Sequence, residues 1–215
     1  MSNVRSGGTE RSYHHGHLRE ALVDAAVSAA RSGGPEAVVL RAATRKAGVS
    51  AGAAYRHFAD RDDLLRAVAL RCLDHMGDLM ERRLDEAEPL LGPDGAWRRL
   101  HVAGRAYVEF AMNEPGWFHT AFAIPVEEQP RREGGNRGLF QILVDVLDQL
   151  VTTGAITPEA RLRAEYVAWS SVHGIATLVT GGSLRDLPPA ERDASIDRVV
   201  RSVTFQVDNV ENLPI

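Results

Sequence analysis

One short segment of the chain combines basic, aromatic and hydroxyl side chains at a spacing that could bind phosphate. Residues 46–58 read KAGVSAGAAYRHF, in which the small residues come first and Tyr55, Arg56 and His57 come last. A tyrosine hydroxyl and cationic side chains donate hydrogen bonds to phosphate oxygens, so these three residues are candidate phosphate ligands. For Arg56 and Lys46, a charge that is simply solvated is an equally good interpretation.

The pattern around this segment predicts two short helices joined by a glycine turn. Residues 40–47 can form one helix, and Gly48 can supply the left-handed backbone that often ends a helix. Ser50 can cap the next helix, which we expect to run to Phe58. Two helices joined in this way describe a helix-turn-helix, whose second helix enters the major groove of DNA.

Small side chains at the start of the second helix would let it approach base edges closely. Ala51, Gly52 and Ala53 offer methyl groups and exposed backbone, and Ser50 offers a hydroxyl group. No Arg, Lys, Asn or Gln in this first turn can make a bidentate contact with a base. Discrimination between DNA sequences must therefore depend on Ser50, methyl contacts, the shape of the DNA or the N-terminal arm, whose Arg5 and Arg11 suit a narrow minor groove.

Charge is unevenly distributed along the chain, whose formal net charge is −4. Residues 1–66 contain ten Lys or Arg and seven Asp or Glu, whereas the remaining residues contain fifteen and twenty-two. A basic N-terminal part joined to an acidic remainder is expected if only one end meets phosphate, although a chance fluctuation also produces an excess of this size.

Other motifs restrict the class of protein. The single cysteine, Cys72, excludes an internal disulfide and favours a reducing compartment. No secretory signal and no apolar run long enough to span a membrane is present, so we expect a cytoplasmic protein.

The chain lacks a serine nucleophile elbow and a phosphate-binding glycine loop, and we expect neither an enzyme nor a cofactor. His14, His15 and His17 could bind a metal, but no carboxylate or cysteine completes a site and we expect none.

Apolar periodicity predicts an all-α protein of about nine helices. Residues 1–12 are expected to form a disordered arm, residues 13–60 a three-helix DNA-binding domain and residues 61–215 a larger helical domain. Later helices are predicted from Asp60 to the break at Pro89 and at about 95–113, 137–153, 158–180 and 189–208, with a short one within 113–122.

The last two long helices are candidates for a dimer interface. A helix-turn-helix reads only a few base pairs, and two copies one helical turn apart are the common solution. An apolar stripe on each helix could build a four-helix interface between two chains, although part of each stripe must be core. The stripes comprise Leu162, Tyr166, Trp169, His173 and Ala176 on the first helix and Ile196, Val199, Val200 and Val203 on the second.

Residues 13–70 resemble the DNA-binding region of the TetR family of transcriptional regulators, through LVDAAVSAARSGG and KAGVSAGAAYRHFADRDDLLRAV. The lead-in YHHG and the segment AWSSVHGIATLV resemble the subgroup whose C-terminal domain carries Trp-x-x-x-His-Gly, the WHG type. The resemblance implies that Tyr55, His57 and Arg61 contact phosphate, with Arg61 where lysine is more usual. Many relatives start the second helix with Thr or Ser, which this chain lacks, and Arg41 is the residue we expect to contact the DNA backbone there.

The resemblance also implies a homodimeric transcriptional regulator, most often a repressor, that leaves a palindromic operator when a small molecule binds. An activator of the same fold and a helical protein-interaction module without specific DNA binding are the alternatives. An aromatic cluster in the second domain could line the pocket for an apolar or amphipathic effector, although such clusters are more often core. The cluster comprises Tyr107, Phe110, Met112, Trp117, Phe118, Phe122, Trp169 and His173.

Overall fold

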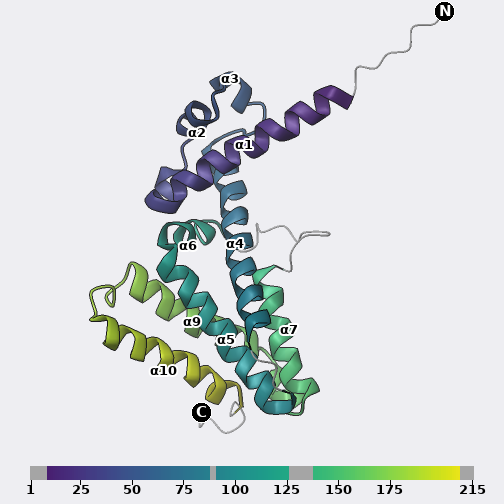
Figure 1. The fold of residues 1–215 in the computed structure, drawn as a ribbon, viewed down its shortest axis with the longest axis vertical. Coiled ribbons are helices and arrows are strands. Elements are labelled where there is room, and N and C mark those ends of the chain that lie inside the picture. Colours follow the sequence, from purple (N-terminus) through teal and green to yellow (C-terminus); the bar gives the residue numbers. More distant parts are fainter. Residues whose placement is uncertain (1–8, 88–90, 126–137, 209–215) are drawn as a thin grey trace, which may run out of the picture. The chain divides into compact units, whose positions relative to one another are not determined.

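The structure, a computed structural model, describes residues 9–87, 91–125 and 138–208 (Figure 1). Within these ranges it contains ten α-helices and one 3-10 helix and no strand, which confirms the all-α expectation. None of the helices described is both long and apolar enough to cross a membrane.

The chain divides into two compact units. The first unit comprises residues 1–72 and 116–129, and the second comprises residues 73–115 and 130–215. Helix α4 (Arg61–Glu86) therefore contributes to both units, and α6 (Pro115–Ala121) belongs almost entirely to the first. A later segment thus returns to pack on α1, which local sequence patterns do not show, and the DNA-binding domain expected at residues 13–60 stays a prediction.

Four helical segments precede α4 in the first unit. They are α1 (Thr9–Gly33), the 3-10 helix η1 (Gly34–Ala37), α2 (Leu40–Ala47) and α3 (Ala51–Ala54). Helix α1 begins at Thr9, so the last four residues of the expected disordered arm are helical, and residues 1–8 lie outside the described part. The side of α1 that carries Leu22, Val23 and Ala30 is buried, with at most 2% exposure.

Helix α6 packs against the C-terminal half of α1 within the first unit. The indole Nε1 of Trp117 donates a hydrogen bond of 2.8 Å to the carbonyl oxygen of Val27. The guanidinium of Arg31 lies 5.0 Å from the centre of the Trp117 ring, a distance typical of a cation–π contact. Phe118, which is 2% exposed, completes the contact by burying its ring in the core of this unit.

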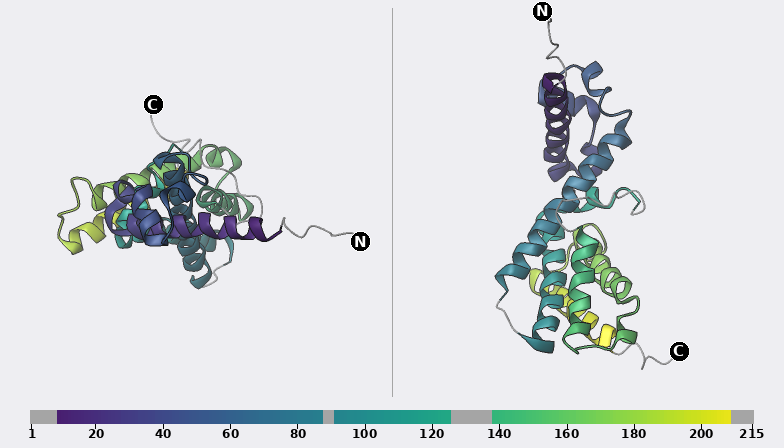
Figure 2. Two further views of the ribbon diagram at one scale, coloured as in Figure 1. Left: turned by 90° about the horizontal axis from the view of Figure 1, so that it is seen from above. Right: turned by 90° about the vertical axis from the view of Figure 1, so that its right-hand side faces the viewer.

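Helix α5 (Gly92–Asn113) is the central helix of the second unit. It packs against α7 (Leu139–Thr152), α9 (Ala164–Thr180) and α10 (Pro189–Asp208). Helices α9 and α10 lie side by side, as all views show (Figure 2).

The helix predicted at 158–180 is interrupted, so that α8 (Pro158–Arg161) is separate from α9. Arg163 adopts a left-handed backbone with φ of 61°, which an α-helix cannot contain. The sequence prediction was wrong at this point because no glycine or proline marks the break.

Replacing Gly116 with alanine is expected to destabilise the first unit. A Cβ atom at this position would overlap the carbonyl oxygens of Ala30 and Arg31, which are backbone atoms that cannot rotate away. We expect the free energy of unfolding to fall by about 1–3 kcal/mol, measured by urea denaturation. Gly138→Ala is the control, because a Cβ there would meet nothing within 4 Å. Equal stability of the two variants would contradict the close packing of α6 on α1.

Candidate nucleic-acid interface

The turn between α2 and α3 is built by Gly48. Its φ of 70° is left-handed, as predicted, and ends α2 at Ala47. The amide of Val49 then donates a hydrogen bond of 3.0 Å to the carbonyl oxygen of Thr44, so this carbonyl in the last turn of α2 has a hydrogen-bond partner. The chain therefore changes direction within the two residues that separate Gly48 from α3.

Helix α3 is capped by Ser50, as predicted, because its Oγ accepts a hydrogen bond of 3.3 Å from the amide of Ala53. The regular helix ends at Ala54, earlier than expected, but a turn continues it: the amides of His57 and Phe58 donate to the carbonyl oxygen of Ala54 at 2.9 and 3.0 Å. The side chains of Ala54 and Phe58 are fully buried. The short helix is therefore anchored at both ends.

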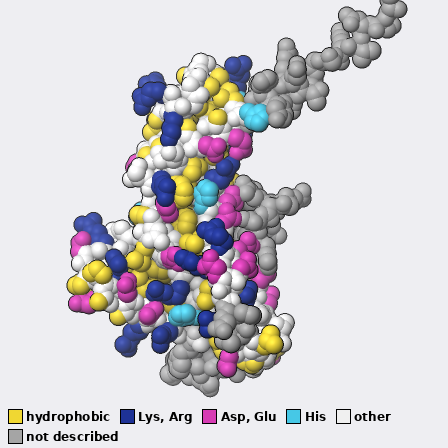
Figure 3. All heavy atoms as spheres, viewed as in Figure 1, with side chains coloured by type: hydrophobic (Ala, Val, Ile, Leu, Met, Phe, Trp, Pro, Cys, Tyr) yellow, Lys and Arg dark blue, Asp and Glu magenta, His cyan; other side chains and the backbone are white. Residues whose placement is uncertain are grey.

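The opposite face of α3 and the turn after it is open to solvent. Ala51, Gly52 and Arg56 are exposed, and the side chain of Tyr55 is 57% exposed. A Cβ at Gly52 would meet nothing within 4 Å, so packing inside the protein does not require glycine there. Figure 3 shows Lys and Arg side chains at the end of the first unit that carries α2 and α3. This face can therefore approach an extended polyanion.

Two basic residues of α2 differ in their surroundings. Arg41 is exposed near the start of the helix. Lys46 is also exposed, but its Nζ donates a hydrogen bond of 2.6 Å to the Oγ of Ser28 on α1. Lys46 therefore helps to hold α2 against α1 in the DNA-free protein.

Arg61, at the start of α4, holds the backbone that leads into α2. Its Nη2 donates to the carbonyl oxygen of Pro35 at 2.6 Å, and its Nε donates to that of Val38 at 3.1 Å. No side chain caps the start of α2, where Val39 occupies the capping position. The arginine fork therefore fixes a segment that has no capping side chain of its own, a role that the sequence did not indicate.

A reciprocal pair of aspartates fixes the start of α4. The Oδ1 of Asp60 accepts a hydrogen bond of 2.8 Å from the amide of Asp63, and the Oδ2 of Asp63 accepts one of 3.1 Å from the amide of Ala59. Two amides that the helix cannot satisfy are thus bonded, and both carboxylates lie where the helix dipole favours negative charge. The expected cap at Asp60 is present.

The residues of the expected aromatic cluster are divided between the two units. Trp117, Phe118 and Phe122 lie in the first unit, where the rings of Phe118 and Phe122 are 5.2 Å apart. The other five belong to the second unit, and of these Phe110 is 4% exposed and forms part of the core. The pocket expected from these eight residues stays a prediction.

Tyr107, Trp169 and His173 do meet in the second unit, at the contact of α5 with α9. The indole Nε1 of Trp169 donates to the Tyr107 hydroxyl at 3.3 Å, and that hydroxyl lies 2.8 Å from Nδ1 of His173. Since the hydroxyl accepts from Trp169, its own proton is available to Nδ1, which favours the His173 tautomer protonated at Nε2. Burial raises the pKa of Tyr107 and lowers the pKa of His173, so both side chains are kept neutral.

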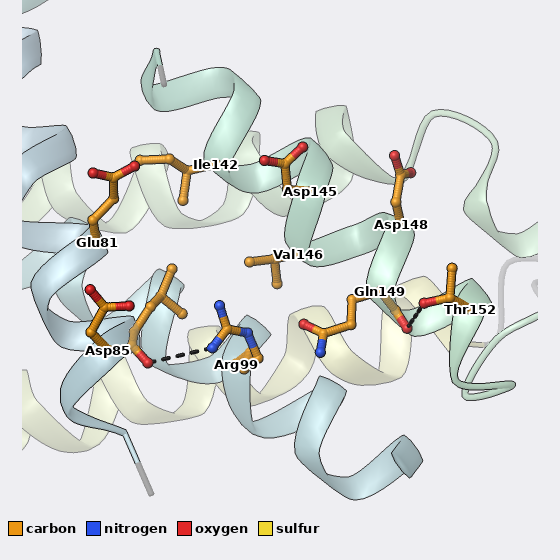
Figure 4. Close-up of a pocket in the computed structure, with 10 residues that line it drawn as sticks. Glu81, Asp85, Arg99, Ile142, Asp145, Val146, Asp148, Gln149 and Thr152 are labelled. Atoms are coloured by element: carbon orange, nitrogen blue, oxygen red, sulfur yellow. Dashed lines mark hydrogen bonds between the residues drawn. The ribbon is translucent and has the colours of Figure 1, made fainter. Parts of the chain in front are cut away.

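A cleft of about 500 Å³ in the second unit contains none of the eight aromatic-cluster residues (Figure 4). Residues of α4, α5 and α7 line it, among them Glu81, Asp85 and Arg99. Sequence reasoning missed it, although the four-residue spacing of Glu81 and Asp85 places two carboxylates on one face of α4. Among the described residues no group of three His, Cys, Asp or Glu could hold a metal ion, and the side chains of His14 and His15 lie outside that set.

A capped recognition helix after a glycine turn, joined to a second helical unit, defines the class of helix-turn-helix DNA-binding proteins. Residues 22–68 match the sequence profile described as bacterial regulatory proteins, tetR family, and residues 100–203 match the profile described as tetracyclin repressor-like, C-terminal domain. The chain belongs to the TetR family of transcriptional regulators. Members of this family are DNA-binding transcription factors and not enzymes.

Individual relatives agree with this assignment. The chain is 26% identical over 205 residues to an HTH-type transcriptional regulator of Haemophilus influenzae, covering 93% of this chain and 90% of that protein. It is 25% identical over 175 residues to an HTH-type transcriptional regulator of Mycobacterium tuberculosis, covering 79% of this chain and 73% of that protein.

Solved structures show the same fold. A Rhodococcus sp. RHA1 protein of unknown function is 29% identical with a TM-score of 0.66, covering 92% of this chain and 97% of that one. RolR, solved with its ligand resorcinol, is 18% identical with a TM-score of 0.64, covering 95% of this chain and 98% of that one.

Arg61→Ala is expected to weaken the fold even without DNA. The variant loses the hydrogen bonds to Pro35 and Val38, so we expect the free energy of unfolding to fall by about 1–2 kcal/mol in urea denaturation. Arg56→Ala is the matched control, because Arg56 is exposed and makes no such bonds. If both variants unfolded like the parent protein, the hydrogen bonds of Arg61 to Pro35 and Val38 would not contribute to stability.

Proposed function

We propose that the protein is a cytoplasmic, homodimeric repressor that binds a palindromic operator and is released from it by a small molecule. The observation that carries this proposal is the exposed face of α3 and its following turn, held by the Ser50 cap and the buried Phe58. A surface of small residues followed by Tyr55 and Arg56 suits the floor of a major groove flanked by phosphates.

The proposed contacts divide into two groups. Ser50, Ala51, Gly52 and Ala53 face the base edges, since their small size permits close approach. The second group contacts phosphate through hydroxyl or charged groups and comprises Arg41, Lys46, Tyr55, Arg56, His57 and Arg61. Arg61 can also act indirectly, because it holds the segment before α2 through Pro35 and Val38.

The proposed dimer forms through α9 and α10. Leu162, Tyr166 and Leu178 leave 72%, 58% and 41% of their surfaces in water, and all three lie on or next to α9. Burying a large apolar side chain fully gains about 1.5–3 kcal/mol, so a symmetric contact that covers these residues twice is favourable. Two copies would present two recognition helices to an inverted repeat.

Release by a ligand follows from a difference in affinity between two dimer conformations. A molecule that binds better to the conformation whose recognition helices do not fit the half-site spacing lowers the affinity for DNA. RolR, which has the same fold, was solved with the ligand resorcinol. An activator could use the same DNA-binding and effector-binding parts. A reporter gene placed behind the operator distinguishes the two, because a repressor lowers its expression and an activator raises it.

Selection of binding sites from a random duplex pool, at near-physiological salt, tests the proposed function. We expect an inverted repeat with half-sites about ten base pairs apart or a small multiple of that distance. If the duplexes recovered with the purified protein shared no sequence motif, specific DNA binding would be contradicted.

Tyr55→Phe and Arg56→Gln are expected to weaken DNA binding to all sequences alike. Each removes a phosphate donor without touching a buried residue, and loss of the Arg56 charge should reduce the slope of log affinity against log salt by about one. Fluorescence anisotropy with a labelled operator, at several salt concentrations, measures both effects. Ala53→Ser is the contrasting variant, because it should alter the preferred sequence and leave the slope unchanged.

Tyr166→Asp is expected to make the protein monomeric. The change places a carboxylate in the proposed interface, where it would be buried without a partner. Sedimentation velocity measures the oligomeric state, and operator affinity should fall with it. Leu91→Asp is the control, because Leu91 is 95% exposed and lies outside α9 and α10. A Tyr166→Asp protein that remained dimeric would place the interface elsewhere.

A further inference from the structure

Lys46 is the one lysine among the 25 Lys and Arg residues of the sequence. Arginine fills every other position of this kind, including Arg41, Arg56 and Arg61 in the proposed DNA-binding surface. The guanidinium group of arginine stays protonated in proteins, whereas the amine of lysine can lose its proton and be acylated. Apart from the α-amino group, Lys46 therefore carries the one amine of this sequence that an acyl donor can modify.

The surroundings of Lys46 leave this amine accessible. Lys46 lies in the last turn of α2 and is exposed, as is Ser28 on α1. The Nζ atom donates a hydrogen bond of 2.6 Å to the Ser28 Oγ, and no carboxylate of the described residues forms an ion pair with it. An amine that is held on one side by a single hydroxyl group can be approached from its other sides.

Positive charge around Lys46 favours an acyl donor that carries phosphate. Helix α2 contains Arg41, Arg45 and Lys46, all exposed, and no carboxylate. On α1, the carboxylate of Asp24, one turn before Ser28, is paired with Arg71 at 3.1 Å. Acyl thioesters of coenzyme A carry phosphates, so the charge that suits DNA also attracts these donors to the amine.

We propose that Lys46 is an acylation site and that its modification by a phosphate-bearing acyl thioester weakens operator binding. The unprotonated Nζ attacks the thioester carbonyl carbon, a C–N bond forms, the C–S bond breaks, and the thiol leaves with the proton that the nitrogen gives up. The product is an uncharged amide, so each chain loses one positive charge from the proposed DNA-binding surface. The effect on DNA rests on the proposed function, whereas the site of acylation does not.

Acetyl-CoA is the probe for the acylation site. The full-length protein is incubated with it, and mass spectrometry of the intact chain and of its peptides gives the number and position of acetyl groups. We expect one side-chain acetyl group per chain, at Lys46, and about tenfold slower acetylation when saturating operator covers the surface. Lys46 that stays unmodified while Nα-acetyllysine amide in the same solution is acetylated would overturn the site.

Fluorescence anisotropy with a labelled operator measures the effect on DNA before and after complete acetylation. We expect the affinity to fall about tenfold and the slope of log affinity against log salt to decrease by about one for each chain. Lys46→Gln, which lacks the charge, should bind like the acetylated parent protein. Lys46→Arg keeps the charge and has no amine to acylate, so treatment with acetyl-CoA should leave its affinity unchanged.

The matched control moves the single lysine to the second unit. In a protein with both Lys46→Arg and Arg98→Lys, the amine lies at an exposed position of α5, outside the proposed DNA-binding surface. We expect this protein to be acetylated without loss of operator affinity. An equal loss of affinity in the parent and the control, or an unchanged affinity of the fully acetylated parent, would overturn the effect on DNA.

An uncharged thioester, S-acetyl-N-acetylcysteamine, tests the class of donor. At low salt we expect the ratio of the acetyl-CoA rate to the rate with this thioester to be about fivefold higher in the parent than in the control, because Arg41 and Arg45 attract the phosphates. Equal ratios would overturn the preference for a phosphate-bearing donor.

The two measurements also distinguish failure of this proposal from failure of the proposed function. A protein that is acetylated at Lys46 but binds no operator has the acylation site and contradicts the proposed function. A protein that binds its operator but is not acetylated at Lys46 is a regulator without this site.

Discussion

The left-handed backbone at Gly48 is the constraint on which the DNA-facing surface depends. At φ of 70° a side chain would clash with the following carbonyl group, at a cost of about 1–2 kcal/mol, so glycine is the residue that permits the turn at this place. The turn sets where Ser50 caps α3, and the cap with the buried Ala54 and Phe58 sets which side of α3 faces solvent. The exposure of Tyr55 and Arg56 is thus a consequence of backbone geometry several residues earlier.

Local rules predicted this part of the molecule well. The helix end at Gly48, the cap at Ser50 and the acidic first turn of α4 each involve residues within about four positions of one another, where side-chain and backbone preferences act directly. The same rules failed where contacts cross the sequence. The hydrogen bond from Arg61 to Pro35 joins residues 26 positions apart, and nothing in the neighbourhood of Arg61 distinguishes this role from a phosphate contact.

The contacts of the aromatic residues show a different limit. Apolar burial is not directional, so sequence proximity does not show that α6 takes Trp117 and Phe118 to α1 while α5 takes Tyr107 to α9. The cleft of the second unit is lined by charged residues of α4, α5 and α7 that are well separated along the chain. The charged residues of each helix alone are typical of a solvated surface. Arg99 lies among carboxylates only because the three helices pack together.

The placement of the three tryptophans gives each unit an intrinsic fluorescent reporter. Trp117 is the tryptophan of the first unit, whereas Trp97 and Trp169 belong to the second. The emission of an indole responds to the polarity around it and to nearby charge, and Trp117 has both a carbonyl partner at Val27 and the cation of Arg31 on its ring. A protein that keeps Trp117 and carries phenylalanine at the other two positions would report the opening of α6 from α1 alone. The converse protein would report the second unit, so the two halves of the molecule are optically separable without any added dye.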